Sequence, residues 1–183
     1  MFGFFGVKGF CTRVMGMALV FLLTACEPVS LDPEALGGHL EQRDGQPVIV
    51  LDRGDVFPIE DEGFSGYVGH AGFRGDDLVL PGWAVDTQRR SSVAALVVIL
   101  DDEIVASVAP DRDRDHVLER WGESANPAGF SVSIPRALVK ETGAVPRLYA
   151  LRMEDSKAAG QLRLTGRARC ILEEHFDDPA RCD

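Results

Sequence analysis

The sequence predicts a mainly β fold, built as an antiparallel β-sandwich with one short crossover helix. Seven apolar runs of strand length follow one another at intervals of about ten residues, with turn-forming residues between them. The run 94–100 is apolar at every position, so we expect it to be a central strand that is covered on both faces. These two observations together favour stacked sheets over a helical fold.

The expected strands are 67–73, 78–86, 94–100, 103–109, 129–134, 147–152 and 161–165. Asp101-Asp102 is expected to form a tight turn that joins the third and fourth strands as a hairpin. A further β-type run, Val48-Ile49-Val50-Leu51, is expected to add an edge strand.

Two helical segments are expected between the strands. Val117, Leu118 and Trp121 recur at helical spacing behind an acidic N-cap, which predicts a short helix over 113–121 that crosses between the sheets. Residues 135–139 resemble a single helical turn, and Gly143 is expected to end it.

The charge of the chain excludes some partners. The net charge is −10, whereas binding to nucleic acid requires a basic face, so we expect no nucleic-acid partner. The same charge argues against electrostatic adhesion to anionic lipid headgroups. Its simplest role is to keep the protein soluble.

The amino terminus has the features of an export signal. It has no acidic residue before Glu27, and Lys8 and Arg13 precede an apolar run, 14–23, that is too short to span a membrane comfortably. The run ends in Leu23-Thr24-Ala25-Cys26, which resembles the lipobox of bacterial lipoproteins. The alternatives are an ordinary signal peptide cut near Ala25, or an uncleaved anchor.

The lipobox resemblance implies that Cys26 receives a diacylglyceryl group, is cleaved free of the signal peptide and is acylated by a fatty acid such as palmitate. Two or more acyl chains anchor a protein stably to a membrane. Cys26 is followed by Glu27 and not by Asp, which in enteric-type bacteria implies sorting to the outer membrane. We therefore expect a lipid-anchored protein of the cell envelope, at the periplasmic face of the outer membrane.

A second resemblance concerns about a hundred residues, 66–164. The motifs, in order, are Gly82-Trp83-Ala84-Val85-Asp86, the apolar strand with its acidic turn, an Arg- and Asp-rich segment that enters a helix (112–117), Gly129-Phe130-Ser131-Val132-Ser133-Ile134-Pro135 and Leu148-Tyr149-Ala150-Leu151. This order is similar to an immunoglobulin-like β-sandwich module of bacterial surface and glycan-related proteins. The resemblance implies contact with carbohydrate, although the chain lacks the catalytic domain that often accompanies such modules.

The expected organisation has four parts. They are a lipoprotein signal peptide (1–25), a flexible tether rich in Pro, Gly and acidic residues (26–46), a β-sandwich domain (47–165) and a disulfide-closed tail (166–183). Lipidation of Cys26 would leave Cys170 and Cys182 as a pair in an oxidising compartment, which predicts a disulfide. His175 lies between them, so a metal site is the alternative, but the disulfide is simpler.

No catalytic, cofactor or metal site is predicted. Asp111, Asp113 and Asp115 alternate like the start of a calcium loop, but His116 and Gly122 stand at positions six and twelve, where such a loop needs Gly and an acid. The chain has neither a zinc-binding His spacing nor a nucleophile elbow. We therefore expect a protein that is not an enzyme.

Two functions remain open, with ligand-binding residues unknown. The first is an envelope lipoprotein that binds a glycan or cell-wall polymer, and the second is an accessory or structural lipoprotein that acts through protein–protein contacts. Trp83 and Trp121 are the residues that would stack on a sugar, but large aromatic residues in a sandwich usually pack in the core, where we expect both. An exposed aromatic pair would favour the first function, and a broad apolar patch or free edge strand the second.

Overall fold

The structure is a computed structural model of the chain, which divides into two units, residues 1–30 and 31–183. Residues 35–154 and 156–182 are described, and all of them belong to the second unit. The predicted signal peptide, the lipobox and Cys26 lie outside the described residues. Within the described part of the chain, no helix is both long and apolar enough to cross a membrane.

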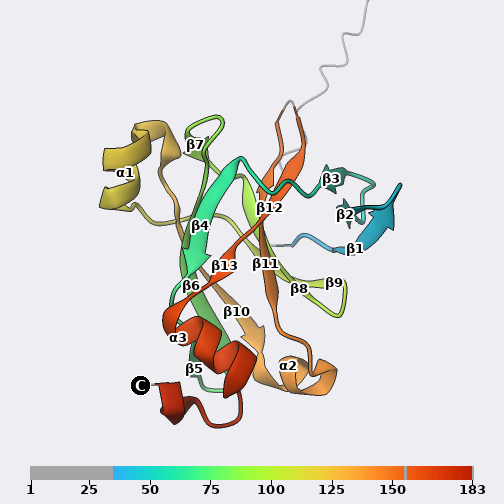
Figure 1. Ribbon diagram of the computed structural model, residues 1–183, viewed down its shortest axis with the longest axis vertical. Coiled ribbons are helices and arrows are strands. Elements are labelled where there is room, and N and C mark those ends of the chain that lie inside the picture. Colours follow the sequence, from blue (N-terminus) through green and yellow to red (C-terminus); the bar gives the residue numbers. More distant parts are fainter. Residues whose placement is uncertain (1–34, 155, 183) are drawn as a thin grey trace, which may run out of the picture. The chain divides into compact units, whose positions relative to one another are not determined.

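The described unit is mainly β, as predicted, and its strands form two sheets (Figure 1). Sheet A has the order β12-β11-β8-β9-β1-β2-β3, and sheet B has the order β10-β6-β4-β13. The strands of sheet A are β1 (Gly38–Arg43), β2 (Gln46–Leu51), β3 (Val56–Pro58), β8 (Ala95–Leu100), β9 (Glu103–Val108), β11 (Arg147–Arg152) and β12 (Ala158–Gln161). Those of sheet B are β4 (Phe64–Val68), β6 (Asp77–Asp86), β10 (Gly129–Pro135) and β13 (Arg163–Leu164), with β5 (Gly72–Arg74) and β7 (Ser91–Ser92) also paired to β6.

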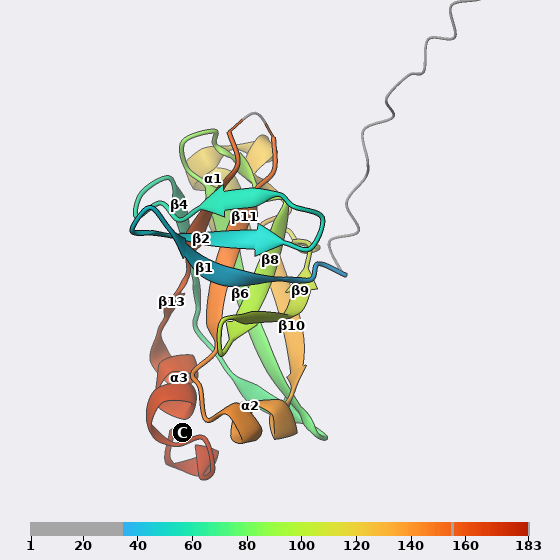
Figure 2. The same ribbon diagram turned by 90° about the vertical axis from the view of Figure 1, so that its right-hand side faces the viewer.

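Sheet A curls until its two ends meet, so it is nearly barrel-shaped. Ile59, just after β3, bridges Ala159 of β12, and the Glu60 N–H donates to the Ala159 carbonyl at 2.8 Å. In Figure 2, β1, β2 and β3 run across the front of β8 and β11. Antiparallel sheets are therefore confirmed, but the specific immunoglobulin-like sandwich is not.

The strands β8 and β11 separate two hydrophobic clusters. Leu96 and Val98 face sheet B, whereas Val97 and Ile99 face the interior of the curled sheet A. Because successive side chains of a strand point to opposite faces, a strand between two cores must be apolar throughout. The prediction of a central strand covered on both faces is thus confirmed. Asp101 and Asp102 have positive φ angles of 49° and 66°, as the predicted hairpin turn requires.

Three short α-helices lie in the described part of the chain. They are α1 (Asp115–Trp121), α2 (Arg136–Thr142) and α3 (Gly166–Arg169), and α3 continues into a π-helical turn, η2 (Cys170–Glu174). The helix α1 lies in the connection from sheet A to sheet B, as predicted, although its N-cap is Arg114 and not an acidic residue. Gly143 ends α2 in the left-handed conformation, with φ of 63°.

Two expectations about the first residues of the fold are wrong. The predicted tether does not extend to residue 46, because Gly38–Arg43 forms β1 and pairs with β2. The run 48–51 is not an edge strand, because β2 lies between β1 and β3. The overlooked signal is Asp44-Gly45, whose positive φ angles of 51° and 78° make the hairpin turn that Asp-Gly favours.

Candidate functional site

Trp83 lies on the outer face of sheet B and not in the sandwich core, so the expectation for this residue is wrong. On β6, Leu78, Leu80 and Ala84 point into the core between the sheets. The side chain of Trp83 has the opposite parity and therefore points outward. It is partly buried there, in a small apolar cluster with Val85.

The helix α1 covers this part of the outer face. Val117 is fully buried and belongs to the same small cluster, together with Ala125 and Ala128 from the segment that follows α1. Trp121, at the end of α1, is partly buried against them. The expected core position of Trp121 is therefore only partly correct, since it packs in this cluster and not between the sheets.

Three aromatic rings surround Trp83. Its ring centroid lies 5.5 Å from that of Tyr67, 5.0 Å from that of His116 and 5.7 Å from that of Trp121. Tyr67 stands directly opposite Trp83 in the β4–β6 register, and the other two rings come from α1. The Tyr67 and His116 contacts are edge-on, with interplanar angles of 76° and 78°, a favourable arrangement for aromatic pairs. We call these four residues the aromatic cluster.

Part of the aromatic cluster is open to solvent. Tyr67 is 42% exposed, and His116 is also exposed. A Cβ atom at Gly69 would lie 2.8 Å from the Tyr67 ring, so the glycine makes room for that ring. The guanidinium of Arg120 lies 4.6 Å from the centroid of Trp121, within cation–π distance. The cluster thus presents an aromatic surface with hydrogen-bonding groups at its rim.

Trp83 of the aromatic cluster and Arg114, which lies beside it, each carry an unsatisfied donor. Among the described residues, the buried Nε1–H of Trp83 and the buried Nε–H of Arg114 have no hydrogen-bond partner. The Nη2 of Arg114 does donate to the Gly82 carbonyl at 3.2 Å. An unmet buried donor costs about 1–3 kcal/mol. Local costs of this kind are expected where a structure serves function as well as stability.

A second candidate site surrounds a buried ion pair. Asp86 and Arg152 line a polar cavity of about 320 Å³ together with Ser91, Ser92 and Ser124. The Asp86 carboxylate accepts from Nε of Arg152 at 2.5 Å and from its Nη2 at 3.1 Å. It also accepts from two backbone N–H groups of the following turn. Both carboxylate oxygens of Asp86 thus accept hydrogen bonds from other groups of the protein. This arrangement suits a structural role better than proton transfer.

The electrostatics of Asp86 agree with this role. Burial acts to raise the pKa of its carboxyl, but the hydrogen bonds from Arg152 and from the N–H groups of Arg89 and Gln88 outweigh burial and lower that pKa. The same pairing raises the pKa of Arg152. Both groups are therefore held in their charged forms.

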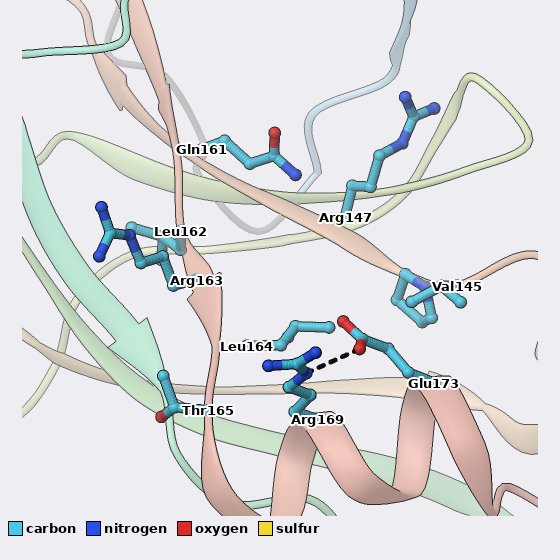
Figure 3. A pocket seen from close by; sticks show the side chains of 10 residues that line it. Val145, Arg147, Gln161, Leu162, Arg163, Leu164, Thr165, Arg169 and Glu173 are labelled. Atoms are coloured by element: carbon cyan, nitrogen blue, oxygen red, sulfur yellow. Dashed lines mark hydrogen bonds and ion pairs between the residues drawn. The ribbon is translucent and has the colours of Figure 1, made fainter.

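A third candidate is a groove of about 590 Å³ beside β11, β13 and α3 (Figure 3). Arginines line it, but Figure 3 shows Arg147 and Arg163 extending in different directions. Arg169 pairs with Glu173 at 2.9 Å, and Arg147 pairs with Asp102 at 2.6 Å. The groove therefore does not direct its positive charges toward one bound anion.

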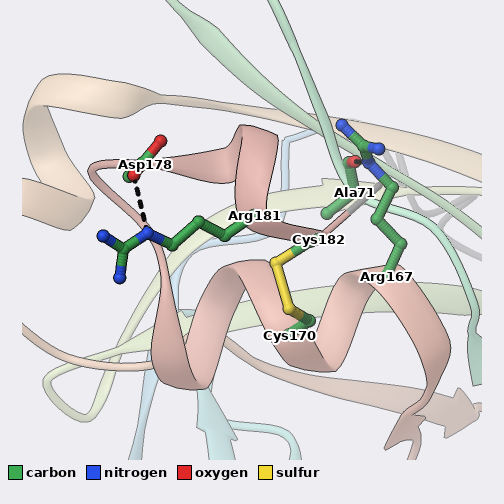
Figure 4. Close-up of a disulfide and its surroundings, with 6 residues drawn as sticks. All are labelled: Ala71, Arg167, Cys170, Asp178, Arg181 and Cys182. Atoms are coloured by element: carbon green, nitrogen blue, oxygen red, sulfur yellow. Dashed lines mark hydrogen bonds and ion pairs between the residues drawn. A yellow bond between two sulfur atoms is a disulfide. The ribbon is translucent and has the colours of Figure 1, made fainter.

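The carboxyl-terminal tail brings its two cysteines to disulfide distance, with Cα atoms 5.8 Å apart, in the pairing that the sequence predicts (Figure 4). Ile171 and Leu172 between them are buried in the main core. Arg167 donates to the Ala71 carbonyl at 3.4 Å, which fixes the start of α3.

Comparison with known proteins identifies no relative. No family model, no curated protein and no solved structure matches the chain.

Proposed function

We propose that this chain is a non-catalytic envelope lipoprotein that binds a glycan or cell-wall polymer through its aromatic cluster. The observation that carries the proposal is the exposure of Tyr67, at 42%, beside Trp83 and Trp121 on one face of sheet B. An exposed aromatic surface of this kind is the feature that separates the glycan hypothesis from its competitors.

The chemistry of the cluster suits a sugar ring. The C–H face of a pyranose is apolar and packs on an aromatic ring, while its hydroxyls need polar partners at the edge. Tyr67 offers the ring, and the exposed His116 and Arg120 offer donors at the rim. Tyr67 is held in place by its edge-on contact with Trp83, so little freedom is lost on binding.

Attachment to the envelope is supported by the amino terminus alone. The lipobox resemblance of Leu23-Thr24-Ala25-Cys26 supports acylation of Cys26, and Glu27 after it supports the outer membrane. A lipid anchor would hold the folded domain near the polymer that it binds.

A second function, protein–protein contact within an envelope assembly, is supported by a different residue. Leu118, on α1, is 41% exposed and lies one helical turn before the partly buried Trp121, so it adds to the apolar surface that a partner protein would cover. This hypothesis gives Leu118 the decisive role, whereas the glycan hypothesis gives it to Tyr67.

Binding of the full chain to isolated cell-wall polymer and to soluble glycans tests the proposal. We expect Tyr67→Ala to weaken binding about tenfold or more, equivalent to about 1.4 kcal/mol, and Tyr67→Phe to retain it because the ring remains. Val145→Ala is the matched control, since Val145 is 41% exposed but does not belong to the cluster.

Equal binding by wild type and Tyr67→Ala would show that the aromatic cluster does not bind the glycan. No glycan binding, together with capture of an envelope protein that Leu118→Ala abolishes, would establish the second function instead.

A further inference from the structure

The carboxyl-terminal tail gathers four metal-binding side chains. Cys170 and Glu174 lie one turn apart on η2, and His175 follows at its end. One ligand atom from each of these three residues lies within 4.8 Å of the others. The 3₁₀ turn η3 (Pro179–Cys182) returns the chain, so that Sγ of Cys182 bonds to Sγ of Cys170. The Cys170 sulfur, an imidazole and a carboxylate therefore lie together, and the second sulfur, of Cys182, is bonded to the first.

The neighbouring charged side chains pair with one another and not with Glu174 or His175. Arg169 pairs with Glu173, and Arg181 pairs with Asp178. Within the described ranges, by contrast, Glu174 and His175 make no side-chain hydrogen bond or ion pair. Glu174 is exposed and His175 is partly exposed, so a metal ion could reach both.

We propose that the tail is a redox-gated zinc site, closed by the disulfide when oxidised and by Zn²⁺ when reduced. A dithiol reductant supplies two electrons and two protons, its own sulfurs become a disulfide, and Cys170 and Cys182 become thiols. Zn²⁺ then displaces the two thiol protons, which pass to solvent, and binds the two thiolates together with His175 and Glu174.

The geometry suits zinc better than a harder cation. A Cys₂HisGlu set combines the sulfur, nitrogen and oxygen donors that zinc accepts in a tetrahedron. Ligand atoms around zinc lie about 3.3–3.8 Å apart, so the atoms of Cys170, Glu174 and His175, which lie within 4.8 Å of one another, must approach by up to about 1 Å. The Cys182 sulfur must move away from that of Cys170, as reduction of the disulfide allows. Such a site would close the same loop as the disulfide and would keep Ile171 and Leu172 docked in the core.

Zinc binding to the full chain carrying Cys11→Ser and Cys26→Ser tests the proposal, because these substitutions remove the other two thiols. We expect one tightly bound Zn²⁺ per chain after reduction with a phosphine and removal of excess metal, and none in the oxidised chain. Cobalt in place of zinc should give a thiolate charge-transfer band and the visible spectrum of a tetrahedral site.

Two variants distinguish the four-ligand site from a simple thiol pair. His175→Ala should weaken zinc binding tenfold or more, and Glu174→Gln should weaken it severalfold. Glu173→Gln is the matched control and should bind like wild type, because Glu173 is paired with Arg169. A reduced chain without bound zinc, or His175→Ala with unchanged affinity and cobalt spectrum, would overturn the proposal. If a tail variant fails to fold, the cobalt spectrum of the full chain with all four tail ligands intact still tests the proposal, because a spectrum that is not tetrahedral would overturn it.

Discussion

Asp86 and Arg152 form a buried ion pair that joins the two sheets, since Asp86 ends β6 of sheet B and Arg152 ends β11 of sheet A. Their side chains are 2% and 4% exposed. Arg152 also donates to Gln88 at 3.0 Å and lies over the ring of Phe64, with its guanidinium carbon 5.0 Å from the centroid. The pair therefore fixes the sheets to each other at one end of the core.

Removal of Arg152 should destabilise the fold strongly. Arg152→Ala leaves the Asp86 carboxylate buried and unpaired, and we expect the free energy of unfolding to fall by about 3–5 kcal/mol in chemical denaturation. Arg147→Ala is the matched control, because its ion pair with Asp102 is largely exposed and should contribute less than about 1 kcal/mol. Similar losses in the two variants would contradict the structural role of the buried pair.

The same pair predicts a loss of stability in acid. The pKa of Asp86 is lowered in the folded state, so its contribution is fully present above the unfolded pKa of about 3.9 and is lost as the pH falls through the lower folded pKa. The free energy of unfolding should therefore decline below about pH 4. In Asp86→Asn this decline should be shallower, because the amide does not titrate. A decline of equal slope in both proteins would show that other carboxyl groups are responsible.

The sequence predicts local features of this fold better than distant relationships. The strand β8 and its hairpin with β9 were predictable, because an apolar run and an Asp-Asp turn are local signals. The closure of sheet A was not predictable, because it depends on a bridge between Ile59 and Ala159, which lie far apart in the sequence. The Asp86–Arg152 pair was missed for the same reason, since 66 positions separate its members.

The outward position of Trp83 could have been predicted. Leu78 and Leu80 establish which parity of β6 faces the core, and Trp83 has the other parity. The contacts of Trp83 with Tyr67 and His116 were not predictable, because they depend on strand register and on the docking of α1. Cys26 lies outside the described residues, so its lipidation stays a prediction.

Lipidation of Cys26 is expected from the lipobox resemblance. Metabolic labelling with a palmitate analogue should mark the wild-type chain but not Cys26→Ser. Cys11→Ser is the matched control, because Cys11 precedes the predicted cleavage position, and this variant should remain labelled. Equal labelling of wild type and Cys26→Ser would exclude a lipid on this residue.

The pairing of Cys170 with Cys182 should be visible chemically. Mass spectrometry of a non-reduced digest, made with Cys26→Ser protein, should recover the two cysteines in one linked species. The chain-entropy model gives a closed loop of this size about 3 kcal/mol of stabilisation, so Cys182→Ser should also make residues 166–182 more sensitive to protease. Recovery of both cysteines alkylated without prior reduction would refute the pairing.

Tryptophan fluorescence tests the glycan proposal most directly. The chain has two tryptophans, and both belong to the aromatic cluster, so a ligand that binds there must alter their environment. Titration of the full chain with solubilised cell-wall glycan should give a saturable change in tryptophan emission in the wild type and in Val145→Ala. Tyr67→Ala should require about tenfold more glycan for the same change. Glycan binding that is detected calorimetrically without any change in tryptophan emission would contradict binding at the aromatic cluster. An identical titration for wild type and Tyr67→Ala would contradict it as well.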